Sequence, residues 1–351
     1  MENQNIAIYI HWPFCKSKCP YCDFNSHEVK GEGGLASEDE YVTALIRDLE
    51  SALPNVWGRS VASVFFGGGT PSLFSAKSID KILTAVRMLL PLEHFAEVTM
   101  EANPGTFEAQ KFADFRAAGI NRLSVGIQSF NAQHLKALGR VHDDREAHKA
   151  VEIALQNFDN VNLDLMYALP GQTLQDARVD IETGCASGAP HISAYHLTLE
   201  PNTMFHRYPP SLPDDELSAE MQVMIEQFTA ENGYANYETS AFTQPSKESR
   251  HNLNYWRFGD YLGIGAGAHA KVTMGHSGEI IRTVKQKHPT LYLEHAATSK
   301  RLMSNEVVDD NTLLFEYFLN HLRIKQPVSW KHFESCTGLE RSMAQGKLKP
   351  L

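Results

Sequence analysis

Short apolar runs alternate with longer amphipathic stretches between residues 6 and 199. The apolar runs are rich in Val, Ile, Leu and aromatic residues and predict six strands, at 6–12, 61–66, 96–102, 122–128, 160–169 and 191–199. Helices are predicted between them, near 38–52, 75–90, 107–118, 131–138, 143–157 and 173–186. The strands mostly lack polar–apolar alternation, which is typical of strands that are buried on both faces.

Six strand–helix repeats predict an α/β fold with a parallel sheet, either open or curled into part of a barrel. The loops that follow such strands gather at one rim, where sites of this architecture lie. The Pro-rich segment 207–216 predicts a domain boundary, which divides the chain into a core of residues 1–206 and a smaller α+β or helical domain of residues 207–351. In that second part, a helix is predicted over 215–232, ended by Gly233, and 306–335 is predicted to be helical again.

Composition narrows the classes of function. The 351 residues carry a formal net charge of -10, which argues against nucleic acid as a partner. No apolar run approaches the roughly 20 residues that span a bilayer, and the first residues do not resemble a secretory signal. A cytoplasmic location is therefore expected, while a peripheral membrane contact and a homodimer are both compatible with the sequence. Cysteines stay reduced in the cytoplasm, so a tight cluster of them indicates metal binding.

Three of the five cysteines form such a cluster directly after the first predicted strand. Cys15, Cys19 and Cys22 have C-x3-C-x2-C spacing. They could hold a four-iron cluster, with one iron left free to bind a small molecule, or a structural zinc with His11 or His27 as the fourth ligand. The spacing alone does not separate these two interpretations. Cys185 and Cys336 stand alone and are predicted to be ordinary buried or half-buried thiols.

Several residues near the strand ends could bind a ligand. The glycine-rich turn 67–71 lets the backbone approach a ligand and offers N–H groups, although it could also be only a tight turn. Glu101 could accept from an ammonium or a hydroxyl group, or could be a solvated strand end. Asp164 interrupts an apolar run and needs partners. Arg140 is its candidate counter-charge or a clamp for a carboxylate, unless it is a surface arginine, and Gln128 ends the fourth strand.

The segment GIGAGAH at 263–269 superficially resembles a dinucleotide-binding loop. Its glycines do not fit G-x-G-x-x-G, and no acidic residue follows in a clean strand–helix–strand unit, so a Rossmann site is rejected.

A set of longer motifs carries a resemblance to a known family. YIHWPFCKSKCPYCDF, FFGGGTPS, MEANP, LSVGIQSF, LGRVH and DLMYALPGQT occur in this order. They resemble the radical S-adenosylmethionine (SAM) superfamily, and within it the coproporphyrinogen dehydrogenase-like group, over roughly residues 6–335. The resemblance implies a partial (β/α)6 barrel. It also implies a [4Fe–4S] cluster on Cys15, Cys19 and Cys22, whose open iron takes the amino and carboxylate groups of SAM.

The same resemblance assigns candidate residues to the cofactors. It implies SAM contacts at Tyr9, Gly68, Gly69 and Thr70, on the rim that also carries Glu101, Gln128, Arg140 and Asp164. Tyr21 and Phe24 flank Cys22 and are expected to pack against the cluster or the adenine. For Tyr9, Tyr21 and Phe24, packing in the core is the alternative role.

Two features point to one branch of this group. The dehydrogenases usually carry a longer N-terminal extension and a fourth cysteine two positions after the third, where this chain has Phe24. The sister branch, the heme chaperones, lacks that cysteine and carries HNxxYW, which occurs here as HNLNYW at 251–256. An imidazole can bind heme iron and aromatic rings can cover a porphyrin, so His251 is the predicted heme-binding residue. His11, His269 and His276 are its rivals.

Two functions therefore stay open. The first is a heme chaperone that passes heme to recipient apoproteins and retains the cluster and SAM. The second is a radical enzyme that oxidatively decarboxylates coproporphyrinogen III. Phe24, the short N-terminus and HNLNYW favour the first, while an RNA-modifying enzyme fits poorly with the acidic charge. Members of the group usually continue past the FESCTGL-like region, so a truncated or altered C-terminal module, with doubtful stability, is expected.

Overall fold

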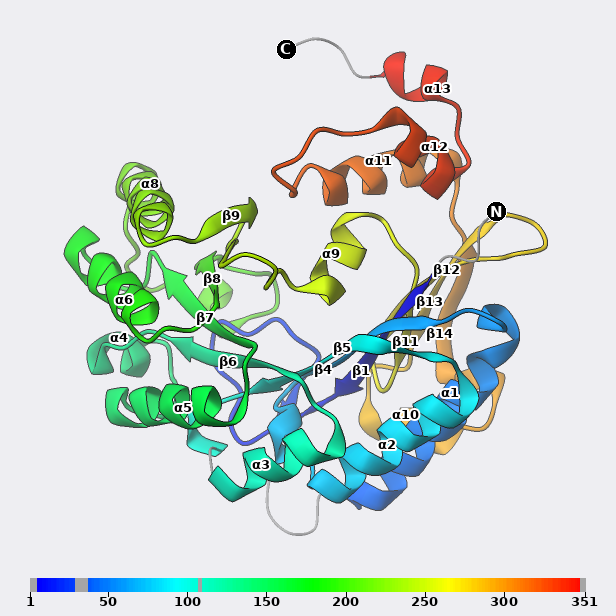
Figure 1. The fold of residues 1–351 in the computed structure, drawn as a ribbon, viewed down its shortest axis with the longest axis horizontal. Helices are drawn as coiled ribbons and strands as arrows, with labels where there is room; N and C mark the ends of the chain where they lie inside the picture. The colour runs from blue at the N-terminus through cyan, green and yellow to red at the C-terminus, as the bar shows by residue number, and fades with distance from the viewer. Residues whose placement is uncertain (1–4, 29–36, 107–108, 348–351) are drawn as a thin grey trace.

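A twelve-stranded mixed sheet organises the part of the chain that the structure describes. The computed structural model describes residues 5–28, 37–106 and 109–347 (Figure 1). The strand order in the sheet is β14-β13-β12-β11-β1-β4-β5-β6-β7-β8-β10-β9. Two short strands, β2 (Phe14–Cys15) and β3 (His27–Glu28), pair separately in parallel.

The centre of the sheet confirms the six predicted strands. They are adjacent and parallel, in chain order: β1 (Ile6–Trp12), β4 (Val61–Gly68), β5 (Leu92–Ala102), β6 (Arg122–Gln128), β7 (Val161–Tyr167) and β8 (His191–His196). The connecting helices follow an arc along one side of the curved sheet (Figure 1): α1 (Glu38–Val56), α2 (Ala76–Leu89), α3 (Ala109–Ala118), α4 (Ala132–Ala137), α5 (Asp144–Asn157) and α6 (Leu174–Ala186). Short 3-10 turns, η1 (Pro71–Leu73) and η2 (Pro104–Thr106), follow β4 and β5. The predicted start of the third helix, at 107, lies outside the described residues.

Local sequence signals set where these helices begin. Ser37, Asp143 and Thr173 each precede a helix and accept a hydrogen bond from the backbone N–H three residues later. In each case the acidic side chain at that later position bonds back to the N-cap backbone, which completes a capping box. Such a cap satisfies two backbone donors that would otherwise have no partner at the helix start.

Polar and apolar residues alternate along β7, contrary to the sequence-based expectation. Leu163 and Leu165 are buried in the main apolar core, whereas Asn162 and Asp164 alternate with them and point to the opposite face. The parallel register pairs Asn162 with Ser124 of β6, which puts a second polar residue on that face. The expected lack of alternation is therefore wrong for β7, because the face turned away from the helices lines cavities, although Asn162 on that face is buried as expected.

The residues after 206 extend both edges of the same sheet. At one edge, β10 (Ala241–Thr243) pairs antiparallel with β8 and with β9 (Ala235–Glu238). At the other edge, β11 (Tyr261–Ile264) pairs in parallel with β1 and is followed by the antiparallel strands β12 (His269–Thr273), β13 (Ile280–Lys285) and β14 (Leu302–Val307). The domain boundary at 206/207 stays a prediction.

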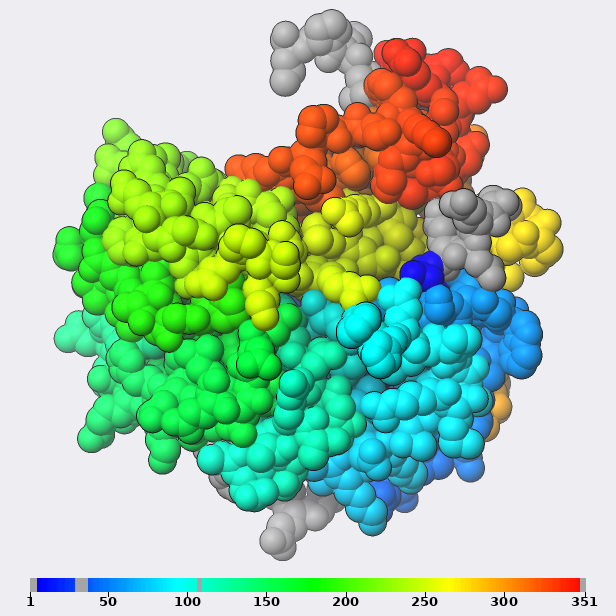
Figure 2. Space-filling view, viewed as in Figure 1, coloured from blue at the N-terminus to red at the C-terminus, as the bar shows by residue number. Residues whose placement is uncertain are grey.

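Helices of this second part cover the sheet edges and form a small lobe. The predicted helix after residue 214 is confirmed as α8 (Asp215–Glu231), and α7 (Met204–Arg207) precedes it. Between β13 and β14 lie α10 (Pro289–His295) and η3 (Ser299–Arg301). Figure 2 shows the last helices as a lobe above the rest of the molecule: α11 (Asp310–His321), α12 (Trp330–Thr337) and α13 (Arg341–Gln345). Of the described helices, none is long and apolar enough to cross a bilayer.

The prediction of one helical segment over 306–335 is wrong in detail. The segment begins in strand β14, and the chain between α11 and α12 is not helical. Pro327 lies in that break, where its ring and missing N–H disfavour a continuous helix. The three helices of the lobe pack around Tyr317 and Phe333, which are fully buried.

A buried carboxylate fastens the β11–β12 edge to the core. Asp260, just before β11, accepts from Arg59 Nη1 at 2.8 Å and from Lys271 Nζ at 2.7 Å, and it also accepts from the backbone N–H of Thr273 at 2.7 Å. Although burial alone would raise the pKa of Asp260, Lys271 and the other partners hold that pKa below its usual range. The carboxylate is therefore charged and balanced by two cations.

A second buried carboxylate does the same for α1. Asp48 pairs with Lys285 of β13 and accepts from Arg301 Nε at 3.2 Å and from the Tyr292 hydroxyl at 2.9 Å. It also accepts from the backbone N–H of Gly265 at 3.3 Å, in the loop after β11. One side chain thus connects α1 with four segments from the second part of the chain.

We expect Asp260→Ala to lower the free energy of unfolding by about 3–5 kcal/mol, because it leaves two cations, Arg59 and Lys271, without their counter-charge in the interior. Urea denaturation measures the loss. The matched control is Glu220→Ala on the exposed face of α8, which should change stability by less than about 0.5 kcal/mol. Equal stability of the two variants would contradict the structural role of Asp260.

Candidate functional site

A cavity of about 650 Å³ lies at the carboxyl ends of the central parallel strands. This "cysteine cavity" brings together twelve of the fourteen site residues predicted from sequence: Cys15, Cys19, Tyr21, Cys22, Phe24, Gly68, Gly69, Thr70, Glu101, Gln128, Arg140 and Asp164. Because the carboxyl ends of parallel strands share one rim, residues far apart in sequence meet there. The other two predicted residues, Tyr9 and His251, line neighbouring cavities.

The three thiols lie at the end of β2 and in the loop that connects β2 with β3. Cys15 is buried at the end of β2, and Cys19 and Cys22 are half-buried. Lys18 Nζ donates to the carbonyl oxygens of Phe24 and Ser26, at 3.0 and 3.3 Å, which closes the loop on itself. Burial raises the pKa of the Cys15 and Cys22 thiols. They are therefore protonated at neutral pH, and a metal centre that binds them has to displace those protons.

His11 is not free to complete a zinc site. Its Nδ1 is hydrogen-bonded to the Tyr9 hydroxyl at 3.0 Å and its Nε2 to the carbonyl oxygen of Asn25 at 2.8 Å. Nowhere in residues 5–28, 37–106 and 109–347 do three His, Cys, Asp or Glu side chains converge closely enough to hold one metal ion. The zinc interpretation with His11 as a ligand therefore has no support in this geometry.

The glycine-rich turn uses its N–H groups internally, which corrects the expectation that they are bare. The N–H of Gly68 donates to Glu101 Oε2 at 3.1 Å, that of Gly69 to the Trp12 carbonyl at 2.6 Å, and that of Thr70 to the Phe14 carbonyl at 2.8 Å. Glycine is needed at position 69 because a Cβ there would lie 2.4 Å from the Phe14 carbonyl oxygen. The turn therefore holds the start of the cysteine loop against β4.

Two of the acidic side chains on the wall of the cysteine cavity, Glu101 and Asp164, have raised pKa values. Burial, and then the nearby charge of Asp164, raise the pKa of Glu101 to about 8. Burial also raises the pKa of Asp164, although its carboxylate accepts from Ser124 Oγ and Asn162 Nδ2, both at 2.8 Å. The predicted need of Asp164 for partners is thus met by neutral donors. A cationic ligand next to them would favour the ionised form of both carboxyl groups and so lower both pKa values.

Arg140 makes no direct ion pair with Asp164, although its positive charge is one of the influences that lower the pKa of Asp164 against the rise caused by burial. Its Nη2 donates to Asn103 Oδ1 at 2.6 Å and to the Gly126 carbonyl at 2.9 Å, and its Nη1 approaches Cys19 Sγ at 3.6 Å. Neutral acceptors next to the thiol loop, rather than the carboxylate, therefore fix the guanidinium. Its Nε is buried without a hydrogen bond to any described residue.

Gln128 ends β6 in a strained conformation. Its φ is 67°, in the left-handed region that non-glycine residues rarely adopt, and a register irregularity separates it from Gly126. Such strain clusters at functional sites, where the surrounding structure enforces it. The conformation brings Gln128 to the cavity wall.

The HNLNYW motif forms the helix α9 (Arg250–Trp256), which packs over β4. His251 is buried, with Nδ1 hydrogen-bonded to Ser63 Oγ at 2.9 Å and Nε2 to the Tyr255 hydroxyl at 3.0 Å. Its ring also stacks on Phe65, with 4.9 Å between the ring centroids. Burial, and then Arg122, lower the pKa of His251 to about 3, so the imidazole is neutral. Both ring nitrogens of His251 are therefore used in hydrogen bonds within the protein.

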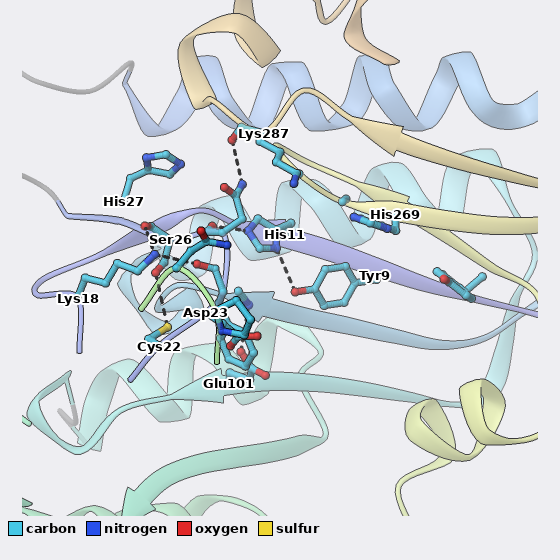
Figure 3. A pocket seen from close by; sticks show the side chains of 18 of the residues that line it. Tyr9, His11, Lys18, Cys22, Asp23, Ser26, His27, Glu101, His269 and Lys287 are labelled. Carbon is cyan, nitrogen blue, oxygen red and sulfur yellow. Dashed lines mark hydrogen bonds between the residues drawn. The ribbon is translucent and has the colours of Figure 1, made fainter. Parts of the chain in front are cut away.

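Two further cavities adjoin the cysteine cavity and share Glu101 with it. The smaller, of about 220 Å³, is lined by Tyr9, His251 and Asp164 among others. The larger, of about 670 Å³, lies between the cysteine loop and the β11–β12 loop, and Figure 3 shows Tyr9, Cys22 and His269 around it. We call it the "histidine cavity". The sequence did not indicate Tyr261 and Lys287 of its wall. The glycine loop 263–269 was noticed in the sequence only for its superficial resemblance to a dinucleotide-binding loop, which was rejected.

Comparisons with known proteins define the class. A model of the radical SAM superfamily matches residues 9–183. The heme chaperone HemW of Escherichia coli strain K12 is 44% identical over 98% of this chain and 91% of its own length, and HemW of Haemophilus influenzae strain Rd is 44% identical over 98% of this chain and 89% of its own. The solved structure of the E. coli radical SAM enzyme HemN, coproporphyrinogen III oxidase, has a TM-score of 0.80 at 20% identity, covering 96% of this chain and 80% of that chain, which shows a shared fold.

Three thiols that follow the first strand of a partial barrel, within the matched region, are the mark of a radical SAM protein. This class implies a [4Fe–4S] cluster and SAM. Within the class, the chain belongs to the HemW heme chaperone family.

We expect Glu101→Gln to flatten the pH dependence of stability. Since the pKa of Glu101 in the folded protein, about 8, lies above that of an unfolded glutamate, the folded state alone holds this proton in the window between. Stability therefore falls as pH rises from about 5 to about 8, by at most ~1.4 kcal/mol per pH unit from this group, and Gln cannot contribute to that fall.

Urea denaturation at several pH values in the same window measures the slope for the wild type and for Glu101→Gln. The control, Glu220→Gln, keeps the wild-type slope because its side chain is exposed. A Glu101→Gln slope equal to that of the wild type would refute the burial of a protonated Glu101.

Proposed function

We propose that the chain is a heme chaperone, which binds heme and transfers it to apoproteins while retaining a SAM-binding [4Fe–4S] cluster. The observation that carries the proposal is 44% identity to two HemW heme chaperones over 98% of the chain. HNLNYW forms most of α9, and its residues line all three cavities, which supports the same function.

Cys15, Cys19 and Cys22 are the proposed cluster ligands. Three thiolates would leave one of four irons without a protein ligand, and that iron can bind the amino and carboxylate groups of SAM. The cysteine cavity fits this role, because the positive charges of Arg140 and Lys18 lie beside the thiols and would offset the negative charge of thiolates.

The remaining wall of the cysteine cavity suits SAM. Its volume lies within the range of about 300–1,000 Å³ that is usual for small-molecule sites. Glu101 and Asp164 would accept from the ammonium and the ribose hydroxyls, and Gln128 offers an amide. Tyr21 and Phe24 offer flat surfaces for the adenine, and Gly68, Gly69 and Thr70 complete the wall. Tyr9 would act from the neighbouring cavity, through the shared Glu101.

Oxidative decarboxylation of coproporphyrinogen III is the second candidate. The match to the coproporphyrinogen III oxidase HemN supports the fold alone, at 20% identity. Phe24 argues for the chaperone, since this position carries an aromatic ring where the enzymes of the group usually carry a fourth cysteine. Its side chain is 57% exposed at the mouth of both large cavities, where a thiol would meet the substrate.

The proposed chaperone acts in the cytoplasm, on recipient heme apoproteins and not on nucleic acid. Formation of a homodimer and a peripheral membrane contact during transfer are part of the same proposal. The formal net charge of -10 supports the exclusion of nucleic acid, because a polyanion would be repelled.

Anaerobic reconstitution should give about four irons and four sulfides per chain. Replacing Cys15, Cys19 or Cys22 by Ser should abolish the charge-transfer absorption, because each supplies one ligand, whereas the control Cys185→Ser should keep it. Iron and sulfide analysis with visible spectra measures both. One tightly held zinc without acid-labile sulfide would contradict the cluster.

The reconstituted protein should bind heme with a visible Soret band and should not decarboxylate coproporphyrinogen III when given SAM and a reductant. Phe24→Cys alone should not create that activity, because the enzyme's pocket involves more than one position. Heme titration and product chromatography test the two halves. Sustained SAM-dependent turnover by the wild type would favour the enzyme, and absence of heme binding would exclude the chaperone.

A further inference from the structure

We propose that heme is held in the histidine cavity, between the cysteine loop and the β11–β12 loop, with His269 as the axial ligand of its iron. The proposal rests on the proposed heme-binding function. On this proposal the residue that binds the iron lies outside HNLNYW, and HNLNYW instead positions part of the cavity wall.

The motif histidine is a poor iron ligand for a geometric reason. An axial imidazole must present a nitrogen lone pair to the iron, but both nitrogens of His251 are engaged, by Ser63 and by the Tyr255 hydroxyl. His251 is also only 1% exposed and lines the smallest of the three cavities, of about 220 Å³. Binding iron would require the whole helix α9 to move. His11 is a poor ligand for the same reason, because its two ring nitrogens are hydrogen-bonded to the Tyr9 hydroxyl and to the Asn25 carbonyl oxygen.

His269 meets the requirements that His251 fails. It is the first residue of β12, is exposed, and lines the histidine cavity (Figure 3). No hydrogen bond to its imidazole is found from any residue of the described ranges. Although the residue as a whole is exposed, partial burial of its ring, and then the positive charges of Lys287 and Arg282, lower the pKa of His269, which favours the neutral form. A neutral imidazole carries the free lone pair that iron binds.

Aromatic rings form part of the wall of the histidine cavity, beside polar residues such as Asn25 and Asn202. The volume of the cavity, about 670 Å³, lies within the usual range for small-molecule sites. Tyr255 and Tyr261 form an edge-to-face pair, with 4.6 Å between their centroids, on one wall. The exposed ring of Phe24 lines the same cavity. Aromatic side chains at these positions can cover a porphyrin face. His251, by its bond to Tyr255, holds that wall in place.

The ammonium of Lys287 can match the charge of a heme propionate. Lys287 and Lys18 both line the cavity and are exposed, and Figure 3 shows them on different sides of it, but Lys18 Nζ already donates to the carbonyl oxygens of Phe24 and Ser26. No acidic side chain of the described residues forms an ion pair with Lys287, so its ammonium remains available. An ammonium next to a carboxylate in a partly buried site forms a charge-assisted hydrogen bond. Asp23, also on the wall, would repel the propionates and orient them toward Lys287.

The cavity is tied directly to the cysteine loop. Asn25 Nδ2 donates to the carbonyl oxygens of Ala266 and Lys287, both at 2.9 Å, and a Cβ on Gly267 would lie 2.4 Å from that nitrogen. Cys22 and Phe24 line the histidine cavity and the cysteine cavity alike. Heme bound here would therefore lie against the outer side of the loop that holds the cluster, and folding of that loop shapes both sites.

Heme titration of the reconstituted full-length protein tests the ligand. We expect His269→Ala to weaken heme binding at least about tenfold and to shift the Soret band, because the iron loses its protein nitrogen. Added imidazole should restore the wild-type band position in that variant, which a purely structural effect would not allow. His276→Ala, in the exposed turn between β12 and β13, is the matched control and should bind like the wild type.

A second experiment tests the orientation of the porphyrin. Lys287→Ala should weaken the binding of heme several-fold but leave the binding of heme dimethyl ester unchanged, because the ester has no carboxylates to pair with. Lys300→Ala, on the exposed 3-10 turn η3, is the control and should not discriminate between the two compounds.

The outcomes separate this inference from the function on which it rests. If the wild type binds no heme, the proposed function fails. If the wild type binds heme and His269→Ala keeps the wild-type Soret band and affinity, only the assignment of the histidine cavity fails. The opposite result would place the iron ligand in HNLNYW. In that case His251→Gln would lose the Soret band and His269→Ala would keep it, while circular dichroism shows that both variants are folded.

Discussion

Two carboxylates buried beside the seam of β1 and β11 hold the early and late parts of the chain in one sheet. Asp260 connects the start of β11 with Arg59 and Lys271, and Asp48 connects α1 with Lys285 and the loop after β11. Buried ion pairs add little net stability over apolar packing, but they specify which segments meet. Here they specify that the β11–β12 loop lies against the cysteine loop. The histidine cavity exists because of that contact.

The central fold was predictable because its signal is local. Each of the six parallel strands is a run of apolar residues followed by a helix with a clear start signal, such as the capping box at Ser37. The seventh parallel strand, β11, was missed. It spans only Tyr261–Ile264, runs into a glycine-rich loop, and pairs with a strand about 250 residues earlier in the chain, as in Tyr9 with Gly263. Nothing in the local sequence specifies such a pairing.

The candidate site shows the same difference between what local sequence predicts and what depends on tertiary contacts. The cysteines and the polar residues at the strand ends could be assigned to one rim, since parallel strands end together. The hydrogen-bond partners of the site residues could not be predicted from the sequence. The N–H groups of the glycine turn are used by Glu101, Trp12 and Phe14, and His251 is held by Ser63, 188 residues away. Whether a donor is free or used depends on tertiary contacts, which a motif does not report. HNLNYW therefore identifies a region that lines the cavities but does not report the role of its histidine, and heme binding there stays a proposal.

Glu101 has a further consequence through its position on the walls of all three cavities. A ligand that changes the charge of this one carboxyl group in one cavity changes the electrostatic potential in the other two. Thermodynamic linkage makes such an effect mutual: the factor by which an occupant of the cysteine cavity changes the affinity for an occupant of the histidine cavity equals the factor in the opposite direction. If the two cavities hold the proposed ligands, their occupation would be coupled through the charge of Glu101 at the boundary.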